Sequence, residues 1–447
     1  MNILSSKYIE NSMIFLILIF PIALIAGPFF INIITSILAI YTLILLPFSK
    51  LVKRIFSHKI SILIIIFSIY LIFNSLISNE PLFSLGSSLF YLRFLLFSIG
   101  LAYLLIKNSK LIIWFGYSLW FCFIILVIDG YFQFIFGYNI FGWEKYDPIR
   151  ISSFFREELI LGSYLSRLLP LCFFLIFFLN QDNIKKIIFI FFCILLIFID
   201  ILIYLTGERT AFVFLFLITI GIILTVPYFR LLRIITFGIS LVSIFIISLS
   251  NNSIKERMID FTLEQSGIIS GKNYDMQEFN KFVAFSPAHQ LHYESSYYIF
   301  IDSPLLGQGP KMFRKLCKKE QYKPQGCSSH PHHTYMQLLA ETGLIGAIPV
   351  LVIFLIISYQ LFKQFIYINF IKKNYMDPRL ALLLISFFVT LWPIAPSGNF
   401  FGSWLNSVYY LPLGFYLFLS SDSRFLLYPD KINTVTEEIQ KPNNVNT

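Results

Sequence analysis

Long apolar runs recur along the whole chain, and they constrain its fold more than any other feature of the sequence. Hydrophobic residues make up 57% of its 447 residues and charged residues only 13%, which excludes an ordinary soluble globule. A helix that crosses a bilayer needs about 17–25 predominantly apolar residues. We therefore predict an all-α polytopic membrane protein with about twelve transmembrane helices. The predicted spans lie at residues 12–27, 29–47, 60–78, 89–106, 111–129, 159–179, 187–205, 211–226, 235–250, 343–361, 380–395 and 405–420.

The charges in the connections between the spans predict their orientation. If the N-terminus is cytoplasmic, the short inner connections carry 14 Lys and Arg residues and the short outer connections carry 4. Positive charge favours the cytoplasmic side of a membrane, so we expect both termini in the cytoplasm. The formal net charge of +10 then mainly reflects topology and gives no argument for nucleic acid as a partner. The first span lacks a clear cleavage site, and we expect it to be retained.

One connection is far longer than the others and divides the chain. Residues 251–335 form an outer segment between two apolar spans, and loops of this length are usually functional. Two stretches within it, "KERMIDFTLEQSG" and "LHYESSYYIFIDSPLLGQG", have the pattern of short helices that end at glycine. We expect nine transmembrane helices in 1–250, a mostly helical outer cap in 251–335, three more spans in 336–421 and a disordered cytoplasmic tail in 422–447.

Histidines gather at the end of this long segment, in "CSSHPHHTYMQLLAETGLIGAI" (327–348). Thr334 and Gln337 match a capping box, which predicts a helix that starts near Tyr335. His332 and His333 would then lie at the positive end of that helix, where neutral imidazole is favoured. Such an imidazole can act as a general base. The alternative is that these histidines are ordinary polar loop residues.

Cys317 and Cys327 both fall in the outer segment, where an oxidising compartment permits a disulfide between them. Free thiols and a metal are the alternatives. A zinc site could draw its ligands from Cys327, His330, His332 and His333, although the disulfide competes for the cysteine and these ligands crowd into seven residues. We expect no metal.

Arginine residues gather at the outer ends of predicted spans. Arg209 follows Glu208 in "LTGERTAF", and "PIRISSFFREELILG" contains Arg150, Arg156, Glu157 and Glu158. Each of these alone could be an interfacial anchor or half of an ion pair. Together they form a group of guanidiniums on one side of the membrane, and guanidinium binds phosphate with two parallel hydrogen bonds. They therefore suit a phosphorylated lipid head group.

Other charged residues have plainer interpretations. Arg93 and Arg167 lie within spans and should face the interior or water, because a charge in lipid is costly. Asp200, also within a span, is either a partner for a buried arginine or a polar lining residue. The basic stretch 311–323, which contains Arg314, is more simply a solvated face than a contact to an anionic ligand.

Several motifs typical of soluble enzymes do not occur in the sequence. It has no G-x-x-x-x-G-K-[ST] phosphate loop and no dinucleotide glycine fingerprint, and no D-x-D pair stands in an outer connection. Nothing therefore indicates a nucleotide or a nucleotide-sugar donor, and we expect no cofactor. Any chemistry should use an activated lipid-linked substrate in the membrane.

The histidine stretch resembles the signature of the O-antigen ligase/polymerase family, membrane glycosyltransferases that act on glycans linked to undecaprenyl diphosphate. The signature is His, then Asn, Ser or Gln, nine residues, Gly, two residues and Gly. It falls here on His332, His333, 334–342, Gly343 and Gly346, and departs from the family at His333. Further segments resemble the family in the same order, namely "DGYFQFIFGYNIFG", "RISSFF", "ELILGSYL", "TGERTAF" and "DSPLLGQGPKMF".

This resemblance implies a metal-independent glycosyl transfer at the periplasmic face of the bacterial inner membrane. His332 would take the proton from the acceptor hydroxyl, and Arg209 and Arg150 would hold the diphosphate leaving group. Supporting residues would be His330, His333, His292, Arg156, Glu157 and Arg314, with His289 as a further candidate. In a ligase the acceptor is a lipid A–core sugar, which the histidine signature slightly favours. In a polymerase it is another lipid-linked repeat unit.

A transporter or flippase for a lipid-linked glycan is the rival from another class. Intramembrane arginine and aspartate residues suit it, but transporters often show two matching halves, and no such halves stand out in this sequence. A transporter also has no need of histidines on one side only.

Overall fold

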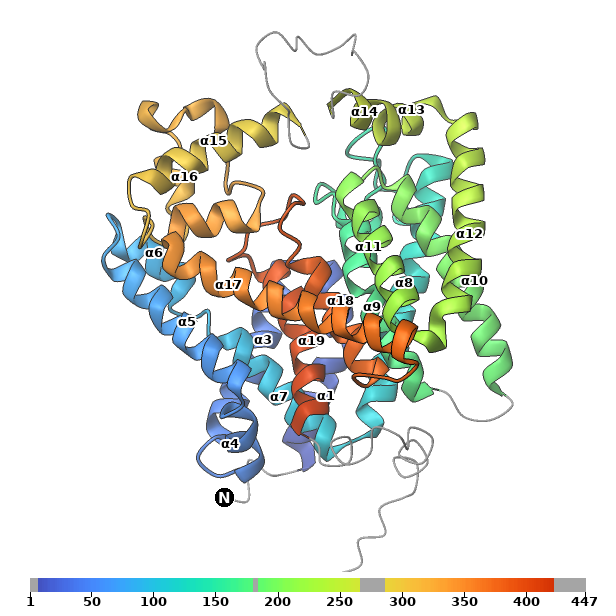
Figure 1. Cartoon of the computed structure of the whole chain (residues 1–447), viewed down its shortest axis with the longest axis horizontal. Helices are drawn as coiled ribbons and strands as arrows, with labels where there is room; N and C mark the ends of the chain where they lie inside the picture. Colours follow the sequence, from blue (N-terminus) through green and yellow to red (C-terminus); the bar gives the residue numbers. More distant parts are fainter. Residues whose placement is uncertain (1–6, 180–183, 266–285, 422–447) are drawn as a thin grey trace, which may run out of the picture.

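A computed structural model describes residues 7–179, 184–265 and 286–421 of the chain, and these residues are almost entirely helical (Figure 1). Tyr138 and Glu144 form an isolated antiparallel bridge. The predicted disordered tail, 422–447, lies outside the described residues. The all-α prediction is confirmed over the described part of the chain.

The first half of the chain builds one side of the bundle and its outer turns. Its α-helices are α1 (Lys7–Leu18), α2 (Phe20–Ala26), α3 (Pro28–Leu45), α4 (Lys50–Phe56), α5 (Lys59–Leu76), α6 (Pro81–Ser88), α7 (Arg93–Lys107), α8 (Lys110–Phe136), α9 (Leu161–Leu179), α10 (Ile184–Leu205) and α11 (Arg209–Thr225), with a 3₁₀ turn η1 (Ser153–Phe155).

The second half contributes the cap and the last spans. Its elements are α12 (Pro227–Ser250), α13 (Asn252–Lys255), the π-helical η2 (Glu256–Asp260), α14 (Phe261–Gln265), α15 (Pro287–Ile301), α16 (Phe313–Leu316), the 3₁₀ turns η3 (Glu320–Tyr322) and η4 (Pro324–Gly326), α17 (Thr334–Ile366), the π-helical η5 (Tyr367–Ile371), α18 (Pro378–Thr390) and α19 (Ser403–Ser421).

Proline and glycine set several of the helix ends. Proline occupies the first turn of α3, α6, α12, α15 and α18, where its missing N–H costs nothing and its fixed φ suits the helix. Gly137 ends α8 in the left-handed conformation, with φ of 85°, and its N–H bonds to the carbonyl of Gln133.

Every predicted span contains a helix, but fewer helices meet the requirements of a complete crossing. Within the described residues, seven are long and apolar enough to span a membrane, and the pair α1 and α2, bent by 48°, would be an eighth. Phe189–Leu205, Arg209–Thr225 and Pro378–Thr390 are apolar but shorter. The chain is therefore a multi-pass membrane protein, while the count of twelve spans stays a prediction.

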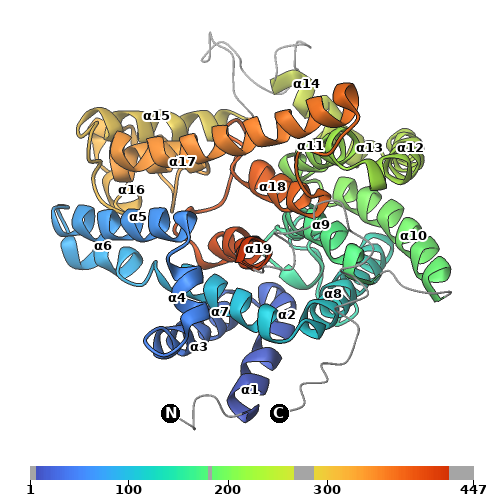
Figure 2. The same ribbon diagram turned by 60° about the horizontal axis from the view of Figure 1, so that its bottom comes forward.

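Helix α19 lies at the centre of the bundle, with α7, α3, α9 and α18 packed around it (Figure 2). The core follows from this position, because α7 is buried continuously from Phe94 to Leu105 and α19 from Leu405 to Phe415. A helix that is apolar on all sides is expected to lie inside a bundle.

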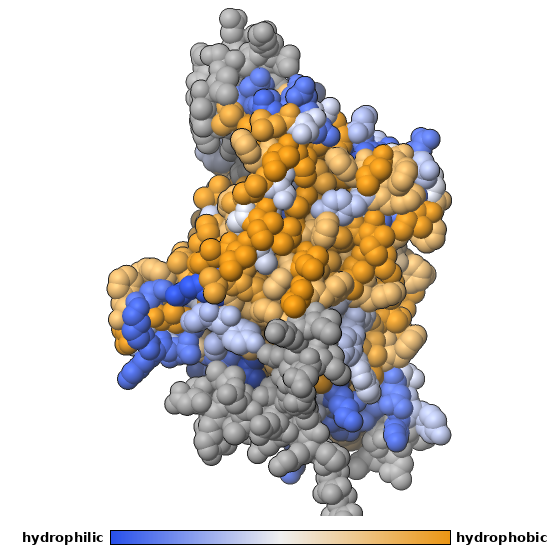
Figure 3. All heavy atoms as spheres, turned by 90° about the vertical axis from the view of Figure 1, so that its right-hand side faces the viewer, coloured by the Kyte–Doolittle hydropathy of each residue, from blue (hydrophilic) through white to orange (hydrophobic). Residues whose placement is uncertain are grey.

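The outer faces of the bundle are also apolar. Figure 3 shows a broad band of apolar side chains on the face formed by α10 and α12, with polar residues above and below it. On α12 this band includes the exposed side chains of Leu231, Val242, Phe245 and Leu249. Lipid tails cover such a band without an unfavourable contact with water.

Asp200 and Arg233 form a fully buried ion pair between α10 and α12. Two parallel hydrogen bonds, of 2.8 and 3.0 Å, join the guanidinium to the carboxylate. Thr219 of α11 accepts from the same guanidinium, and Ser240 donates to the carboxylate. The sequence left open whether Asp200 pairs with an arginine, and the structure places it in such a pair.

The long segment between α12 and α17 contains both predicted helices within its described parts. Residues 252–265 form α13, η2 and α14, and the second stretch forms α15. In Figure 1 these helices lie together at one end of the bundle, with α16 beside α15. That this end is periplasmic stays a prediction.

Removal of one partner of the buried ion pair should destabilise the protein strongly. Asp200→Ala leaves the Arg233 guanidinium buried without its carboxylate, which we expect to cost about 3–5 kcal/mol of unfolding free energy. The double variant Asp200→Leu with Arg233→Met removes both charges and should be close to wild type. Denaturant unfolding in detergent measures the difference, and a single variant as stable as the double one would contradict the expectation.

Candidate active site

The site is organised by a break in α17. Gly343 has φ of 61° and ψ of −167°, which interrupts the helix between Thr342 and Leu344. The first segment of α17, Thr334–Thr342, therefore leaves the line of the predicted span. The break leaves two backbone N–H groups without partners in the helix, those of Leu344 and Ile345. They donate instead to the carbonyls of Pro304 and Leu305.

The turn that receives these donors belongs to the cap. Gly307 packs against Gly343 so closely that a Cβ on Gly307 would lie 2.5 Å from the Gly343 nitrogen, and one on Gly343 would lie 2.3 Å from the Leu305 carbonyl oxygen. The N–H groups of Gln308 and Gly309 return hydrogen bonds to α17. The segment "DSPLLGQGPKMF" and the glycine of the histidine signature thus form one joint.

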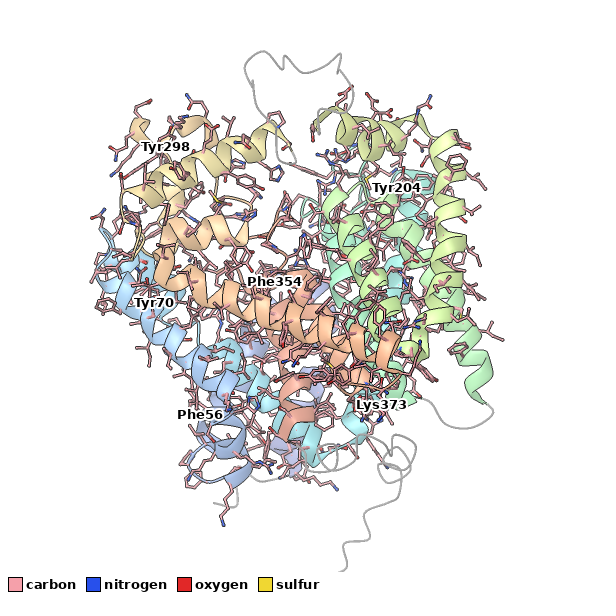
Figure 4. The ribbon with its side chains drawn as sticks, viewed as in Figure 1. Phe56, Tyr70, Tyr204, Tyr298, Phe354 and Lys373 are labelled. Carbon is pink, nitrogen blue, oxygen red and sulfur yellow. A yellow bond between two sulfur atoms is a disulfide. The ribbon has the colours of Figure 1, made fainter. Side chains whose placement is uncertain are left out.

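A third element, α5, completes this joint. The hydroxyl of Tyr70 donates to the carbonyl of Thr342 at 2.6 Å, and the side-chain amide of Asn74 donates to that of Leu306 at 2.5 Å. Figure 4 shows Tyr70 on α5 near the start of α17. Gly346 provides the space for this contact, because a Cβ there would lie 3.2 Å from the Tyr70 ring.

The turn that carries the histidines is held by the connection between α18 and α19. His332 has φ of 55°, a left-handed conformation that is uncommon outside glycine. Its carbonyl accepts from the Ser397 N–H at 2.9 Å, and the Thr334 and Ser397 hydroxyls bond at 2.7 Å. Gln337 binds Asn399 and the Phe400 N–H. No motif in the sequence indicated that residues 391–402 belong to the site.

His333 has a structural role, because both of its ring nitrogens bind the backbone. It is the N-cap of α17, and its Nδ1 accepts from the Met336 N–H at 3.2 Å. Its Nε2 lies 3.0 Å from the carbonyl oxygen of Pro393, which can only accept, so Nε2 carries the proton. Both ring nitrogens are therefore used. The predicted capping box is wrong, because Thr334 and Gln337 have partners in the 391–402 connection.

His332 has a different environment. Within the described residues its ring nitrogens have no hydrogen-bond partner, and the ring packs among three other imidazoles. The ring centroids lie 4.1 Å from His330, 5.1 Å from His292 and 6.0 Å from His289. We call these four residues the histidine cluster. The two members on α15, His289 and His292, lie 43 and 40 positions before His332 in the chain.

The environment keeps His289, His330 and His332 neutral near pH 7. Burial and, to a smaller extent, the charge of His292 lower the pKa of His332 to about 4. Burial likewise lowers the pKa of His330 to about 3 and that of His289 to about 4, with contributions from neighbouring histidines. The sequence predicted neutral imidazole from the helix field. The structure gives the same direction, with burial as the main cause.

Two arginines lie close enough to the cluster to affect the titration of its members. Arg209, at the start of α11, is one of the charges that lower the pKa of His289. Arg314, on α16, acts in the same way on His330. The predicted residues Arg209, Arg314 and His332 are thus brought to one region of the molecule. Arg209 also donates to the side-chain oxygen of Gln265 at 2.6 Å.

Arg150 and a third arginine pack beside Arg209. The carbonyl of Gly207 accepts from Nε of Arg257 at 2.9 Å. A Cβ on Gly207 would lie 2.9 Å from that nitrogen and 3.1 Å from Cγ of Arg150. Arg257 was not predicted, since "KERMIDF" resembles any basic helix start after a span. The mutual repulsion of the group, after burial, lowers the pKa of Arg257.

Glu208 has a structural role in this region. Its carboxylate accepts from the N–H groups of Gly162 and Ser163, at 2.6 and 3.1 Å, and from the Ser163 hydroxyl. These donors belong to the first turn of α9, so Glu208 satisfies the free N–H groups of that helix from another segment. The motifs "ELILGSYL" and "TGERTAF" meet at this contact.

Other predicted residues lie outside this arrangement. Arg156 is exposed and stacks on Trp143, 3.9 Å from the ring centroid. Glu157 is exposed beside it. Arg93 donates to Asn32 at 3.0 Å near the start of α7, and Arg167 is buried against Phe214.

The disulfide between Cys317 and Cys327 is present in the structure, with the Cα atoms 4.9 Å apart. It closes a hairpin of the cap next to the histidine cluster. This pairing occupies the cysteine that the zinc alternative required. Within the described residues no group of three or more His, Cys, Asp or Glu side chains is arranged to hold a metal ion.

Several buried polar atoms around the cluster lack a partner among the described residues. They are Nε2 of His330, the hydroxyl of Tyr293, Nε of Arg314 and Nε of Arg150. A buried polar atom without a partner is costly, and its presence is expected where a ligand binds. The arrangement therefore brings neutral imidazoles and arginine side chains into one region with unsatisfied polar atoms.

The joint at Gly343 should tolerate no side chain. Gly343→Ala forces a Cβ against the Leu305 carbonyl in a left-handed conformation, which we expect to cost at least about 1–3 kcal/mol of unfolding free energy. Gly238→Ala in α12 is the matched control, because a Cβ there meets nothing within 4 Å. Thermal unfolding in detergent compares them, and equal stability of the two variants would contradict the role of the joint.

One known protein family is similar to the part of the chain that contains these site residues. Residues 194–351, from α10 into α17, match the family model described as O-Antigen ligase. The matched stretch includes Arg209, the histidine cluster and Gly343. No curated protein matches the chain. This stretch of the chain is therefore similar to the O-antigen ligase family.

Proposed function

We propose that this protein is a membrane glycosyltransferase of the O-antigen ligase or polymerase type. Its donor would be a glycan on undecaprenyl diphosphate, and its acceptor a sugar hydroxyl at the periplasmic face of the inner membrane. The observation that carries the proposal is the neutral His332 ring, which packs on His289 and His330, the two histidines whose pKa values Arg209 and Arg314 respectively lower. The match to the O-antigen ligase family model supports it.

His332 would act as the general base. As the acceptor oxygen attacks the anomeric carbon, its proton passes to the imidazole and the bond from that carbon to the diphosphate breaks, with inversion. A neutral imidazole can accept this proton, and His332 has ring nitrogens without a hydrogen-bond partner in the described chain. His333 is the poorer candidate, because both of its nitrogens are used.

The arginine group would bind the leaving diphosphate. Negative charge develops on the diphosphate as the glycosidic bond breaks, and fixed positive charge at that point stabilises the transition state. Arg209 and Arg150 are the proposed ligands, and the packing of Arg257 on Gly207 adds a third guanidinium to the group. No metal or other cofactor takes part in this proposal.

The proposed reaction has two possible acceptors, which distinguish a ligase from a polymerase. Lipid A–core would make the protein a ligase, and a second lipid-linked glycan would make it a polymerase. We propose the ligase, on the strength of the histidine signature and the description of the matched family. The orientation is a separate part of the proposal: both termini would be cytoplasmic, because the inner connections carry more Lys and Arg than the outer ones.

A transfer assay tests the function and the roles of the two residues. Purified protein in detergent receives the lipid-linked donor with either acceptor, without added metal. We expect His332→Ala to lower turnover by about 10²–10⁴-fold, since a general base is lost. Arg209→Ala should lower it by about 10²–10³-fold, since a charge contact in the transition state is lost.

Matched variants separate these roles from folding. His333→Asn keeps an N-cap for α17, and Arg156→Ala removes an arginine that stacks on Trp143 outside the cluster. Both should retain most of the activity. Full activity of His332→Ala would exclude it as the base. Movement of donor across liposomes without any transfer would favour the transporter.

The pH profile gives a second, independent test. Protonation of His332 removes its capacity as a base, so activity should fall as pH falls through the pKa of that residue. Because burial and His292 lower this pKa to about 4, we expect activity to persist from pH 7 to about pH 5 and to fall below it. Loss of activity near pH 6.5, the ordinary value for histidine, would contradict a buried base.

A further inference from the structure

The histidine cluster contains a second imidazole whose orientation is fixed. His292 on α15 packs on His332 with ring centroids 5.1 Å apart and an angle of 31° between the planes. The other α15 histidine, His289, lies one turn earlier and farther away, at 6.0 Å. His292 is therefore the closer contact that α15 makes with the proposed base.

The protonation pattern of His292 follows from its partner. Its Nδ1 lies 2.8 Å from the carbonyl oxygen of Gly326. A carbonyl only accepts, so Nδ1 carries a proton, and in the neutral ring Nε2 is the atom that can accept one. A backbone carbonyl that fixes one ring nitrogen in this way sets the orientation and the tautomer of the ring.

The carbonyl of Gly326 is itself held in place. A Cβ on Gly326 would lie 2.0 Å from the carbonyl oxygen of Leu291, so this turn is in contact with α15. The Ser295 hydroxyl donates to the carbonyl of Lys323 at 2.7 Å, and Cys327 is linked by the disulfide to Cys317. Close packing at Gly326, a hydrogen bond to Lys323 and the disulfide at Cys327 therefore all hold the turn that orients His292.

We propose that His292 is a positioning residue for the transfer reaction, which holds the His332 ring and keeps it in its proton-accepting form. This inference rests on the proposed function. The effect is electrostatic as well as steric, because the charge of His292, after burial, contributes to the lowered pKa of His332. His289 and His330 also face His332, with Arg209 and Arg314 behind them.

A merely structural role would have a different signature. If His292 only joined α15 to the turn at Gly326, its replacement would loosen the cap without a change in the titration of His332. If it acts on His332, its replacement raises the pKa of that residue from about 4, although burial, the larger cause, keeps it below 6.5. Activity at acid pH would then be lost first.

The variant His292→Gln tests this directly. Its side-chain amide can still donate to Gly326 but carries no charge at any pH. We expect turnover to fall on the order of 10-fold, with KM for the donor little changed and the acid limb of the profile shifted to higher pH. The matched control, His289→Gln on the same helix, should leave the acid limb where it is in wild type.

The outcomes separate the two proposals. If wild type transfers glycan, His332→Ala does not, and His292→Gln keeps the wild-type acid limb, the inference is overturned while the proposed function stands. If wild type transfers nothing to either acceptor, both are overturned. Thermal unfolding checks that the variant folds, and His292→Asn replaces it if it does not. Histidine C2-hydrogen exchange, followed by mass spectrometry, reports the His332 titration without reference to activity.

Discussion

The site depends on one backbone constraint, the break of α17 at Gly343. In a bilayer every backbone polar group needs a partner within the protein, so a spanning helix can break only where another segment supplies one. The carbonyls of Pro304 and Leu305 do so here. The exchange fixes the cap to the bundle, and it directs the first segment of α17, with the histidines at its start, away from the line of the span. The proposed base is therefore placed by a joint 11 positions away from it in the chain.

The other motifs of the sequence act in the same way. Glu208 satisfies the first turn of α9, while Gln133 accepts from the backbone of the turn that begins at Ser152, 19 positions later. Each contact joins a side chain to free backbone N–H groups of a distant segment, inside a region with little water. Such bonds are costly to lose. Several motifs that resemble the family thus have a structural role, because their side chains hold distant segments together. The proposed glycosyl transfer then depends on the histidines and arginines.

The sequence predicted the helical segments and the disulfide between Cys317 and Cys327, because these follow from local pattern and residue type. It also singled out the two stretches that contain Arg209 and His332. It failed where the partner lies far along the chain. The capping box at Thr334 was wrong because Ser397, 63 positions later, binds that hydroxyl. Arg257 was missed because only the fold brings it onto Gly207. Nothing local marks His333 as the histidine whose two nitrogens are already used.

A single physical condition serves both halves of the proposed chemistry. Exclusion of water strengthens the attraction between guanidinium groups and a diphosphate, because the effective dielectric constant falls. The same exclusion disfavours the charged form of imidazole and so keeps His332 ready to accept a proton. Arg209, which would hold the leaving group, and Arg314 oppose protonation of His289 and His330 respectively. A burial that is costly for folding therefore favours the base and the anion-binding group together.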